Sequence, residues 1–213
     1  MIPILYQDAH VIVCVKPTGI SSQEAGEDSL PARLKEQLGL RDLYVIHRLD
    51  REVGGVMVFA ASQSAAAALT REVQERTMEK RYLAVLNGSV PPQGVLEDLL
   101  FHDRQRNKTY VMQRSRKGVK EAKLEYRLVE EKDGVSLVDI LLHTGRTHQI
   151  RVQFSSRKLP LVGDRRYGGP SCEQIGLWSW SLKFRHPENG TEMHYTRLPS
   201  EESLPWAQFS VQP

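Results

Sequence analysis

The sequence predicts an α+β fold in which a mostly antiparallel, mixed β-sheet is flanked by helices and loops. Short runs of β-branched and aromatic residues outnumber the stretches that have helical periodicity. Turn dipeptides such as Asp133-Gly134 separate some of these runs and favour hairpins, which pair antiparallel. No linker-like segment divides the chain, so we expect residues 1–213 to form a single domain.

The N-terminal part begins with two apolar runs and a helix. Leu30, Leu34 and Leu38 recur every four residues between Ser29 and Gly39, a pattern typical of a short amphipathic helix capped at both ends. In chain order we expect strands at 4–6 and 11–15, a turn at 16–19, a loop at 21–29 and this helix.

The middle of the chain combines strands with one Ala-rich helix. Residues 62–76 contain no Gly or Pro and have high helix propensity. Pro91-Pro92 and Gly94 interrupt any regular period, so residues 91–119 are expected to be irregular with short strands. In chain order the other expected elements are strands at 45–46, 56–59 and 80–86, and a hairpin of 122–129 with 135–142.

The C-terminal part contains one polar helix and a last hairpin. Thr147 is expected to cap a helix that carries His148 and Arg151 on one face. In chain order we then expect loops at 159–164 and 167–170, a hairpin of 178–184 with 192–195, and a peripheral tail from residue 198.

Composition restricts the class of protein. The net charge of +3 says little about partners, but basic side chains gather in short runs, which suit phosphate contacts and equally a solvated face. Cys14 and Cys172 belong to no CxxC motif or His/Cys cluster, so we expect a reduced, cytoplasmic setting and no metal site. No stretch approaches the ~20 apolar residues of a membrane span, so no membrane partner is expected.

One carboxylate stands out in residues 46–60, IHRLDREVGGVMVFA. Asp50 lies between Arg48 and Arg51 and is followed by Gly54-Gly55 and an apolar strand. Most aspartates in such company form only a surface ion pair. A position between apolar strands and beside cations instead predicts a partly desolvated, ionised carboxylate, which suits a nucleophile or a base.

Other polar side chains each allow two interpretations. Tyr82 is either a core residue or a functional one, and Arg146 and Arg151 are either phosphate contacts or surface charges. His143 and His148 lack the i, i+4 spacing of a helical metal site, so metal catalysis is not expected. The chain has no Walker loop, GxGxxG, GxSxG or zinc-deaminase motif, which argues against those chemistries.

Five motifs follow one another in the order of a known family. His47-Arg48-Leu49-Asp50, with Gly55 and the following apolar strand, resembles the HRLDxxxSGLLLFA signature of the RluA family of pseudouridine synthases. The other four resemble the family's NKPxGL, KxYLA, TGRxHQIR and LGDxxYG segments and comprise residues 15–20, 80–84, 144–151 and 161–168. The resemblance implies the pseudouridine synthase fold and isomerisation of uridine in rRNA or tRNA to pseudouridine, with no cofactor and no metal.

The resemblance also implies roles for individual residues. Asp50 matches the catalytic aspartate, which attacks either the ribose C1′ or the uracil C6. Tyr82 matches the tyrosine against the target base, Arg151 the arginine that pairs with the aspartate, and Arg48 an arginine near the flipped-out nucleotide. The other expected RNA-binding residues are His47, Arg146, His148, Arg106, Lys108, Arg165 and Arg166.

The chain departs from the family pattern at three positions. Gly54 stands where Ser or Thr is usual, and Gln153 and Trp178 stand where His is usual. Neither Gly54 nor Gln153 carries the implied chemistry, whereas Trp178 and Trp180 are expected either to reshape the RNA-facing edge or simply to pack. The small N-terminal RNA-binding domain of many relatives is not expected here, because the motif at 15–20 begins so early, and we expect a monomer.

Two other functions compete with this interpretation. A non-catalytic RNA-binding or RNA-folding factor of the same fold would keep the shape without turnover, but it would not need Asp50, Tyr82 and Arg151 together. An aspartyl-nucleophile hydrolase would usually carry a DxD-type metal pair, which is missing around Asp50.

Overall fold

The computed structural model of the protein describes residues 1–23, 26 and 28–210. Residues 24, 25 and 27 of the loop predicted at 21–29, and residues 211–213 of the predicted tail, lie outside the described residues. By its contacts the chain divides into two compact units, Met1–Lys80 with Trp178–Pro199 and Arg81–Leu177 with Ser200–Pro213. The prediction that the whole chain acts as one domain remains a prediction.

The sheet of the first unit is built from both ends of the chain. Its strands are, in sheet order, β1 (Ile4–Gln7), β2 (Val11–Lys16), β4 (Gly54–Ala60), β10 (Leu177–Arg185) and β11 (Glu192–Thr196), with β3 (Tyr44–Val45) beside β4. The pairing of β10 with β4 is parallel, and the other pairings in this unit are antiparallel. The predicted mixed sheet of an α+β fold is therefore confirmed.

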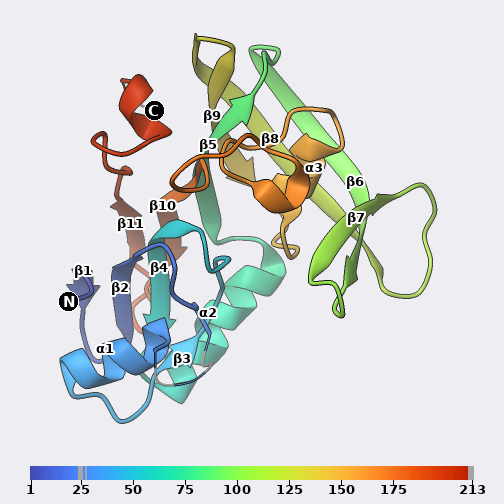
Figure 1. The fold of residues 1–213 in the computed structure, drawn as a ribbon. Helices are drawn as coiled ribbons and strands as arrows, with labels where there is room; N and C mark the ends of the chain where they lie inside the picture. The colour runs from blue at the N-terminus through green and yellow to red at the C-terminus, as the bar shows by residue number, and fades with distance from the viewer. Residues whose placement is uncertain (24–25, 27, 211–213) are drawn as a thin grey trace. The chain divides into compact units, whose positions relative to one another are not determined.

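Two helices of the first unit have the predicted bounds to within a residue, α1 (Leu30–Leu38) and α2 (Gln63–Glu75). Each begins after a serine whose side chain accepts a backbone N–H of the first turn, which satisfies one of the donors that a helix start leaves unpaired. α2 runs beside β3 and β4 (Figure 1) and buries Ala65 and Leu69 against the β-branched residues of the sheet. Among the described residues, no helix is long and apolar enough to cross a membrane.

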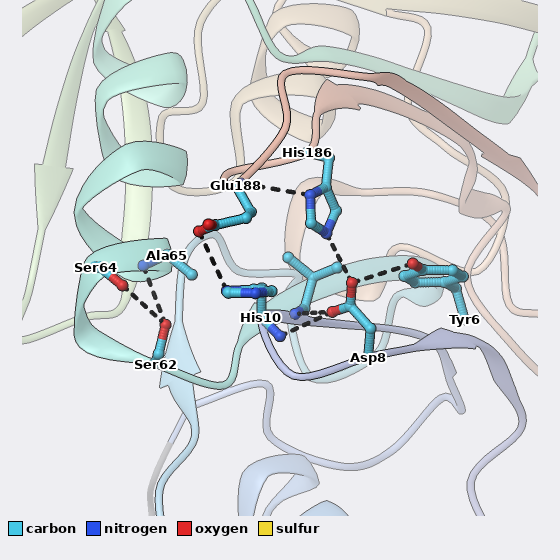
Figure 2. Close-up of polar contacts among 9 residues, drawn as sticks. Tyr6, Asp8, His10, Ser62, Ser64, Ala65, His186 and Glu188 are labelled. Carbon is cyan, nitrogen blue, oxygen red and sulfur yellow. Dashed lines mark hydrogen bonds and ion pairs between the residues drawn. The ribbon is translucent and has the colours of Figure 1, made fainter.

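A polar cluster fastens the two hairpin turns of this unit to each other (Figure 2). One oxygen of Asp8, in the β1–β2 turn, accepts the backbone N–H groups of His10 and Val11, both at 2.8 Å. The other oxygen lies 2.7 Å from Nε2 of His186, in the β10–β11 turn, and 3.1 Å from the hydroxyl of Tyr6. Burial by itself would raise the pKa of Asp8, but these hydrogen bonds together lower it to about 2.

The second unit is an antiparallel sheet with one helix packed on it. Its strands are, in sheet order, β5 (Glu79–Asn87), β9 (Val135–Leu142), β8 (Val119–Lys132), β6 (Gln93–Asp103) and β7 (Lys108–Met112). The predicted hairpin at Asp133-Gly134 joins β8 to β9 and is confirmed. The helix α3 (Gln149–Ser155) packs against β6 and β7 (Figure 1), and Phe154 contacts the Tyr126 ring edge-on.

The prediction of irregular structure at residues 91–119 is wrong. β6 and β7 occupy most of this segment. Residues Gln93–Phe101 pair with β8 along their whole length. They form a strand because hydrogen bonding to this neighbour outweighs the weak local sequence pattern. Gly94 does not interrupt the strand but leaves space for a neighbour, since a Cβ there would lie 2.6 Å from the Tyr126 ring.

Two further local predictions are wrong. Thr147 does not cap α3: the N-cap is His148, which has φ 53° and makes no side-chain cap, while the Thr147 carbonyl accepts the hydroxyl of Thr109. The tail is not peripheral, because Trp206 and Phe209 are buried in the second unit. Large aromatic side chains of this kind gain too much from burial to stay on the surface.

Candidate active site

Asp50 lies in an irregular loop between β3 and β4, in the first unit. Its side chain is half-buried, and its carbonyl accepts the backbone N–H of Val53 at 3.0 Å, which closes a tight turn. The fully buried strand β4 begins directly after this turn. The chain therefore holds the carboxylate between strands of one sheet, as the sequence pattern predicted.

A buried lysine holds the backbone that follows Asp50. Lys16, the last residue of β2, is fully buried, and its Nζ donates to the carbonyls of Pro17 (3.1 Å), Arg51 (3.1 Å) and Val53 (2.6 Å). Burial lowers the pKa of Lys16 to about 8, although the nearby charge of Asp50 acts to raise it. Lys16 is thus mostly protonated at neutral pH and binds the turn at 16–19 to the Asp50 loop.

Two more contacts fix the loop on both sides of Asp50. Gly19 and Arg51 exchange hydrogen bonds, from the Gly19 N–H to the Arg51 carbonyl (2.8 Å) and from Arg51 Nε to the Gly19 carbonyl (2.7 Å). The buried Ser22 hydroxyl donates to the carbonyl of Leu49 (2.6 Å) and accepts its N–H (3.1 Å). Sequence reasoning missed Ser22 and treated Lys16 as a turn residue, because nothing local to them refers to the Asp50 loop.

His47 is turned into the protein. Its Nε2 accepts the backbone N–H of Val58 at 3.1 Å, and its Nδ1 is buried with no hydrogen-bond partner among the described residues. Burial and, secondarily, the charge of Lys80 lower the pKa of His47 to about 3, so the ring is neutral with its proton on Nδ1. This geometry suits positioning of the loop better than the predicted RNA contact. Arg48, by contrast, is exposed.

Two of the departures from the family pattern meet each other in the structure. Gly54 lies opposite Trp178 in the parallel pair of β4 and β10, and a Cβ on Gly54 would lie 2.3 Å from Cζ3 of the indole. Gly55, at φ +124°, has no room for a side chain either, since a Cβ added there would lie 2.1 Å from the carbonyl oxygen of Ser179. A Ser or Thr at position 54 and a Trp at position 178 are therefore incompatible with this backbone.

The second unit carries Tyr82 and Arg151, which are both buried. Tyr82 lies on β5 opposite Ile140 of β9. Arg151, on α3, makes a two-point contact with Asp164, from Nε to Oδ2 (2.7 Å) and from Nη2 to Oδ1 (2.8 Å). Asp164 also caps the short 3₁₀ helix η1 (Arg165–Tyr167), so this carboxylate fixes the arginine in one orientation.

Basic residues that lie about sixty positions apart in the chain meet on the surface of this unit. Nη1 of Arg166 donates to the carbonyls of Arg106 (3.3 Å) and Asn107 (3.1 Å). Lys108 Nζ lies 5.4 Å from the centre of the Tyr167 ring. Arg165 neighbours Arg166 on η1 and is exposed, as are Arg106 and Arg166. We call the surface formed by Arg106, Lys108, Arg165 and Arg166 the basic patch.

Arg146 and His148 are held by contacts inside the second unit. Arg146 Nε donates to the carbonyl of Glu121 at 2.9 Å, and the residue is half-buried. His148 is buried, and its Nδ1 lies 2.9 Å from the hydroxyl of Tyr167. His148 is therefore an internal side chain in this geometry, whereas Arg146 keeps part of its surface.

The predicted site residues are divided between the two units. His47, Arg48 and Asp50 belong to the first, and Tyr82, Arg151 and the other predicted RNA-binding residues to the second. The pairing of Asp50 with Arg151, and the placement of Tyr82 beside them, remain predictions. Within the residues that the structure describes, no group of three or more His, Cys, Asp or Glu side chains is arranged to hold a metal ion.

Comparison with known proteins identifies the family of this chain. Residues 10–156 match the family model for RNA pseudouridylate synthase. The chain belongs to the RNA pseudouridylate synthase family. The resemblance inferred from the five motifs is thereby confirmed.

This pseudouridylate synthase family member has named relatives in several bacteria. It is 33% identical to the "Ribosomal large subunit pseudouridine synthase D" of Neisseria meningitidis serogroup A over 90% of the chain, and spans only 56% of that protein. It is 34% identical to the "Dual-specificity RNA pseudouridine synthase RluA" of Salmonella typhimurium, with 93% of each chain covered. The chain thus spans about half the length of its first relatives but nearly the full length of others.

Solved structures confirm the pseudouridine synthase fold. Human RNA Pseudouridylate Synthase Domain Containing 1 matches with a TM-score of 0.80 at 22% identity, covering 94% of this chain and 84% of that one. Human RNA Pseudouridylate Synthase Domain Containing 4 matches with a TM-score of 0.75 at 25% identity, covering 92% and 88%. The α+β fold expected for this pseudouridylate synthase family member is the fold of these neighbours.

Proposed function

We propose that this chain is an RNA pseudouridine synthase that isomerises uridine in rRNA or tRNA, with Asp50 acting on a flipped-out uridine. The observation that carries the proposal is the anchoring of the Asp50 loop, in which Ser22 fixes the residue before Asp50 and Lys16 the residues after it. A reacting carboxylate must be held in a productive geometry, whereas a surface that only binds RNA needs no such support.

The proposed reaction is balanced without any external reagent. Uridine and pseudouridine contain the same atoms: the bond from C1′ to N1 breaks, a bond from C1′ to C5 forms, C5 loses a proton and N1 gains one. The reaction consumes no oxidant or reductant. It requires only a nucleophile, a base and a site that retains the detached uracil. We propose that Asp50 attacks C1′ or C6, that Tyr82 lies against the base and that Arg151 pairs with Asp50.

For RNA binding we propose the exposed Arg48, the half-buried Arg146 and the basic patch. Arg106, Arg165 and Arg166 are exposed, and Lys108 lies over an aromatic ring. Such cations suit the phosphate backbone next to an extruded nucleotide. His47 and His148 are assigned to positioning in this proposal, because one ring nitrogen of each contacts a protein group and the other nitrogen of His47 is buried.

The family resemblance of the sequence motifs implies rRNA or tRNA as the substrate. The name of one relative, a ribosomal large subunit synthase, supports rRNA, and the name of another, a dual-specificity RNA synthase, specifies no class of RNA. We propose that the substrate is one of these two RNA classes. A cytoplasmic location and a monomeric state belong to the same proposal.

The test is pseudouridine mapping with purified protein on total RNA from a strain that lacks the gene. Wild-type protein should restore pseudouridine at one or a few positions of rRNA or tRNA. Asp50→Ala should abolish turnover and keep RNA affinity within a fewfold. Asp42→Ala, at an exposed aspartate outside the site, is the matched control and should behave as wild type.

Two outcomes would contradict the proposal. If wild-type protein restores no pseudouridine in any RNA but still binds RNA, the non-catalytic RNA-binding factor is the better description. If Asp50→Ala still turns over, the protein is a synthase but Asp50 is not its reacting carboxylate.

A further inference from the structure

The hydroxyl of Tyr167 connects the basic β6–β7 hairpin to the start of α3. It accepts the backbone N–H of Thr109, at the beginning of β7, at 2.8 Å. The same oxygen lies 2.9 Å from Nδ1 of His148, the residue immediately before α3. Tyr167 is buried, and burial raises the pKa of its phenol, so the hydroxyl stays protonated at neutral pH. One neutral hydroxyl therefore joins two elements.

Two cations lie close to the ring of Tyr167. The guanidinium carbon of Arg151 is 5.3 Å from the ring centre, and Lys108 Nζ is 5.4 Å from it. Both distances are within the ~6 Å over which a cation is attracted to an aromatic ring. One residue thus touches the basic patch and the arginine proposed for the reaction.

The backbone of Tyr167 is fixed to the same arginine through Asp164. Its N–H donates to Asp164 Oδ1 at 3.3 Å, and that oxygen also accepts Nη2 of Arg151. Its carbonyl accepts the hydroxyl of Ser155, at the end of α3, at 2.7 Å. A shift of Tyr167 must therefore disturb the orientation of Arg151, because packed and hydrogen-bonded groups of this kind do not deform smoothly.

A parallel connection runs through the side chain of Thr109. Its hydroxyl donates to the carbonyl of Thr147 at 2.8 Å and lies 3.1 Å from Nδ1 of His102. The hairpin is thus bonded to both residues that precede α3, Thr147 directly and His148 through Tyr167.

We propose that Tyr167 is a positioning residue that couples the grip of the basic patch on RNA to the orientation of Arg151. The inference rests on the proposed function, which assigns RNA to the patch and the reaction to Arg151. RNA that pulls on the hairpin acts on Thr109 and Lys108, and Tyr167 transmits the displacement to Arg151 through contacts that are all direct.

The first test is Tyr167→Phe, which keeps the ring and the backbone bonds and removes only the hydroxyl. In single-turnover kinetics we expect the rate constant of the chemical step to fall about tenfold, while the Kd for RNA changes by less than twofold. Tyr195→Phe, at a half-buried tyrosine of the first unit, is the matched control and should retain both values. An unchanged rate constant, or a loss that lies in Kd alone, would overturn the proposal.

The second test does not depend on activity. Oligodeoxythymidylate, an unreactive single-stranded polyanion, is added while the amide signal of Thr109 and the side-chain Nε–H signal of Arg151 are followed by NMR. In wild-type protein both signals should shift, and in Tyr167→Phe only that of Thr109. If the Arg151 signal shifts equally in both proteins, or in neither, the coupling is absent.

These arms separate the coupling from the proposed function. A wild-type protein that makes no pseudouridine defeats the proposed function, and the NMR arm still decides the coupling. Should Tyr167→Phe fail to fold, the ring signals of Tyr167 are followed in the same titration of the wild-type protein, because the coupling passes through this residue. If the Thr109 and Arg151 signals shift while those of Tyr167 do not, the proposal is overturned.

Discussion

At the scale of single residues, the Asp50 loop depends on side chains that lie elsewhere in the sequence. Lys16 places an ammonium among three carbonyls, and Ser22 binds both polar groups of the Leu49 backbone. Each contact offsets the desolvation of a buried polar group, and removal of one partner leaves the others unsatisfied. The loop is thus sensitive to substitutions at residues that need not touch RNA.

Lys16→Met should leave a folded but impaired protein. Methionine fills much of the same space, but three loop carbonyls lose a charged donor, so we expect the free energy of unfolding to fall by roughly 2–4 kcal/mol. We expect kcat to fall by about 10² because the Asp50 backbone is no longer fixed. Urea denaturation and turnover assays measure the two effects, with the exposed Lys132→Met as control. A folded variant with wild-type kcat would show that the ammonium is not needed for positioning.

Gly54→Ser should destabilise the first unit, and Trp178→His should relieve much of that loss. The serine Cβ would lie 2.3 Å from the indole, whereas a smaller ring at position 178 opens space. We expect a loss of about 2 kcal/mol or more for the single variant and a clear coupling in a double-mutant cycle. Additive effects of the two substitutions, measured by thermal or urea unfolding, would contradict this account.

At the scale of elements, the β1–β2 and β10–β11 turns are held together by the carboxylate of Asp8. Residues more than 170 positions apart are joined at this point, since Asp8 and His186 are separated by 178 residues. Between these turns, β2 pairs with β4 along its whole length, and β10 pairs with β4 at Trp178 and Ser179. The contacts described between the turns themselves are made by side chains. The cluster therefore contributes a pH-dependent part to the stability of the first unit.

Asp8→Asn should remove that pH dependence. The pKa of Asp8 in the folded protein is about 2, below the 3.8 of an ordinary aspartate, so the folded state favours the charged form. Its contribution, on the order of 2 kcal/mol, is complete above pH ~4 and is lost as the pH falls from ~4 towards ~2. Urea unfolding at several pH values should show the wild type approaching the variant across this window, with Asp42→Asn as control. A constant difference between the two proteins down to pH ~2 would contradict the assignment.

At the scale of the whole molecule, a net charge of only +3 conceals a strongly basic local surface. The basic patch concentrates four cations from two segments of the second unit, and the carboxylate of Asp103 lies 3.8 Å from Nε of one of them, Arg106. Association with a polyanion depends more on the local electrostatic potential than on the net charge of the protein. RNA affinity should therefore depend steeply on the salt concentration.

Arg165→Gln combined with Arg166→Gln should weaken RNA binding and flatten its salt dependence. Loss of two phosphate contacts is expected to reduce the slope of log K against log salt by about 1.4 for single-stranded RNA. Filter binding or fluorescence anisotropy between low and physiological salt measures the slope, and Lys132→Gln serves as a control outside the patch. An unchanged slope would place the RNA on another surface.

Local sequence patterns are enough to predict many of the elements and the family. The bounds of α1 and α2, and the turn and pairing of the β8–β9 hairpin, follow from caps, turn dipeptides and periodicity, which act over a few residues. β8 itself is three residues longer at each end than the predicted strand at 122–129. The same short range explains two wrong predictions. β6 has no clear local pattern, because pairing with β8 stabilises it, and His148 stands at the N-cap of α3 in place of Thr147.

The side chains that support the site are distant in the sequence and are brought together by tertiary packing. The carbonyls bound by Lys16, the hold of Asp164 on Arg151, the meeting of Arg166 with Arg106 and the fit of Trp178 on Gly54 all depend on sheet register and helix packing. A one-residue slip in the register of β2 or β10 would send Lys16 or Trp178 to the opposite face of the sheet. Such contacts join residues too far apart for a local pattern to encode them, so they emerge only when the sheets are assembled.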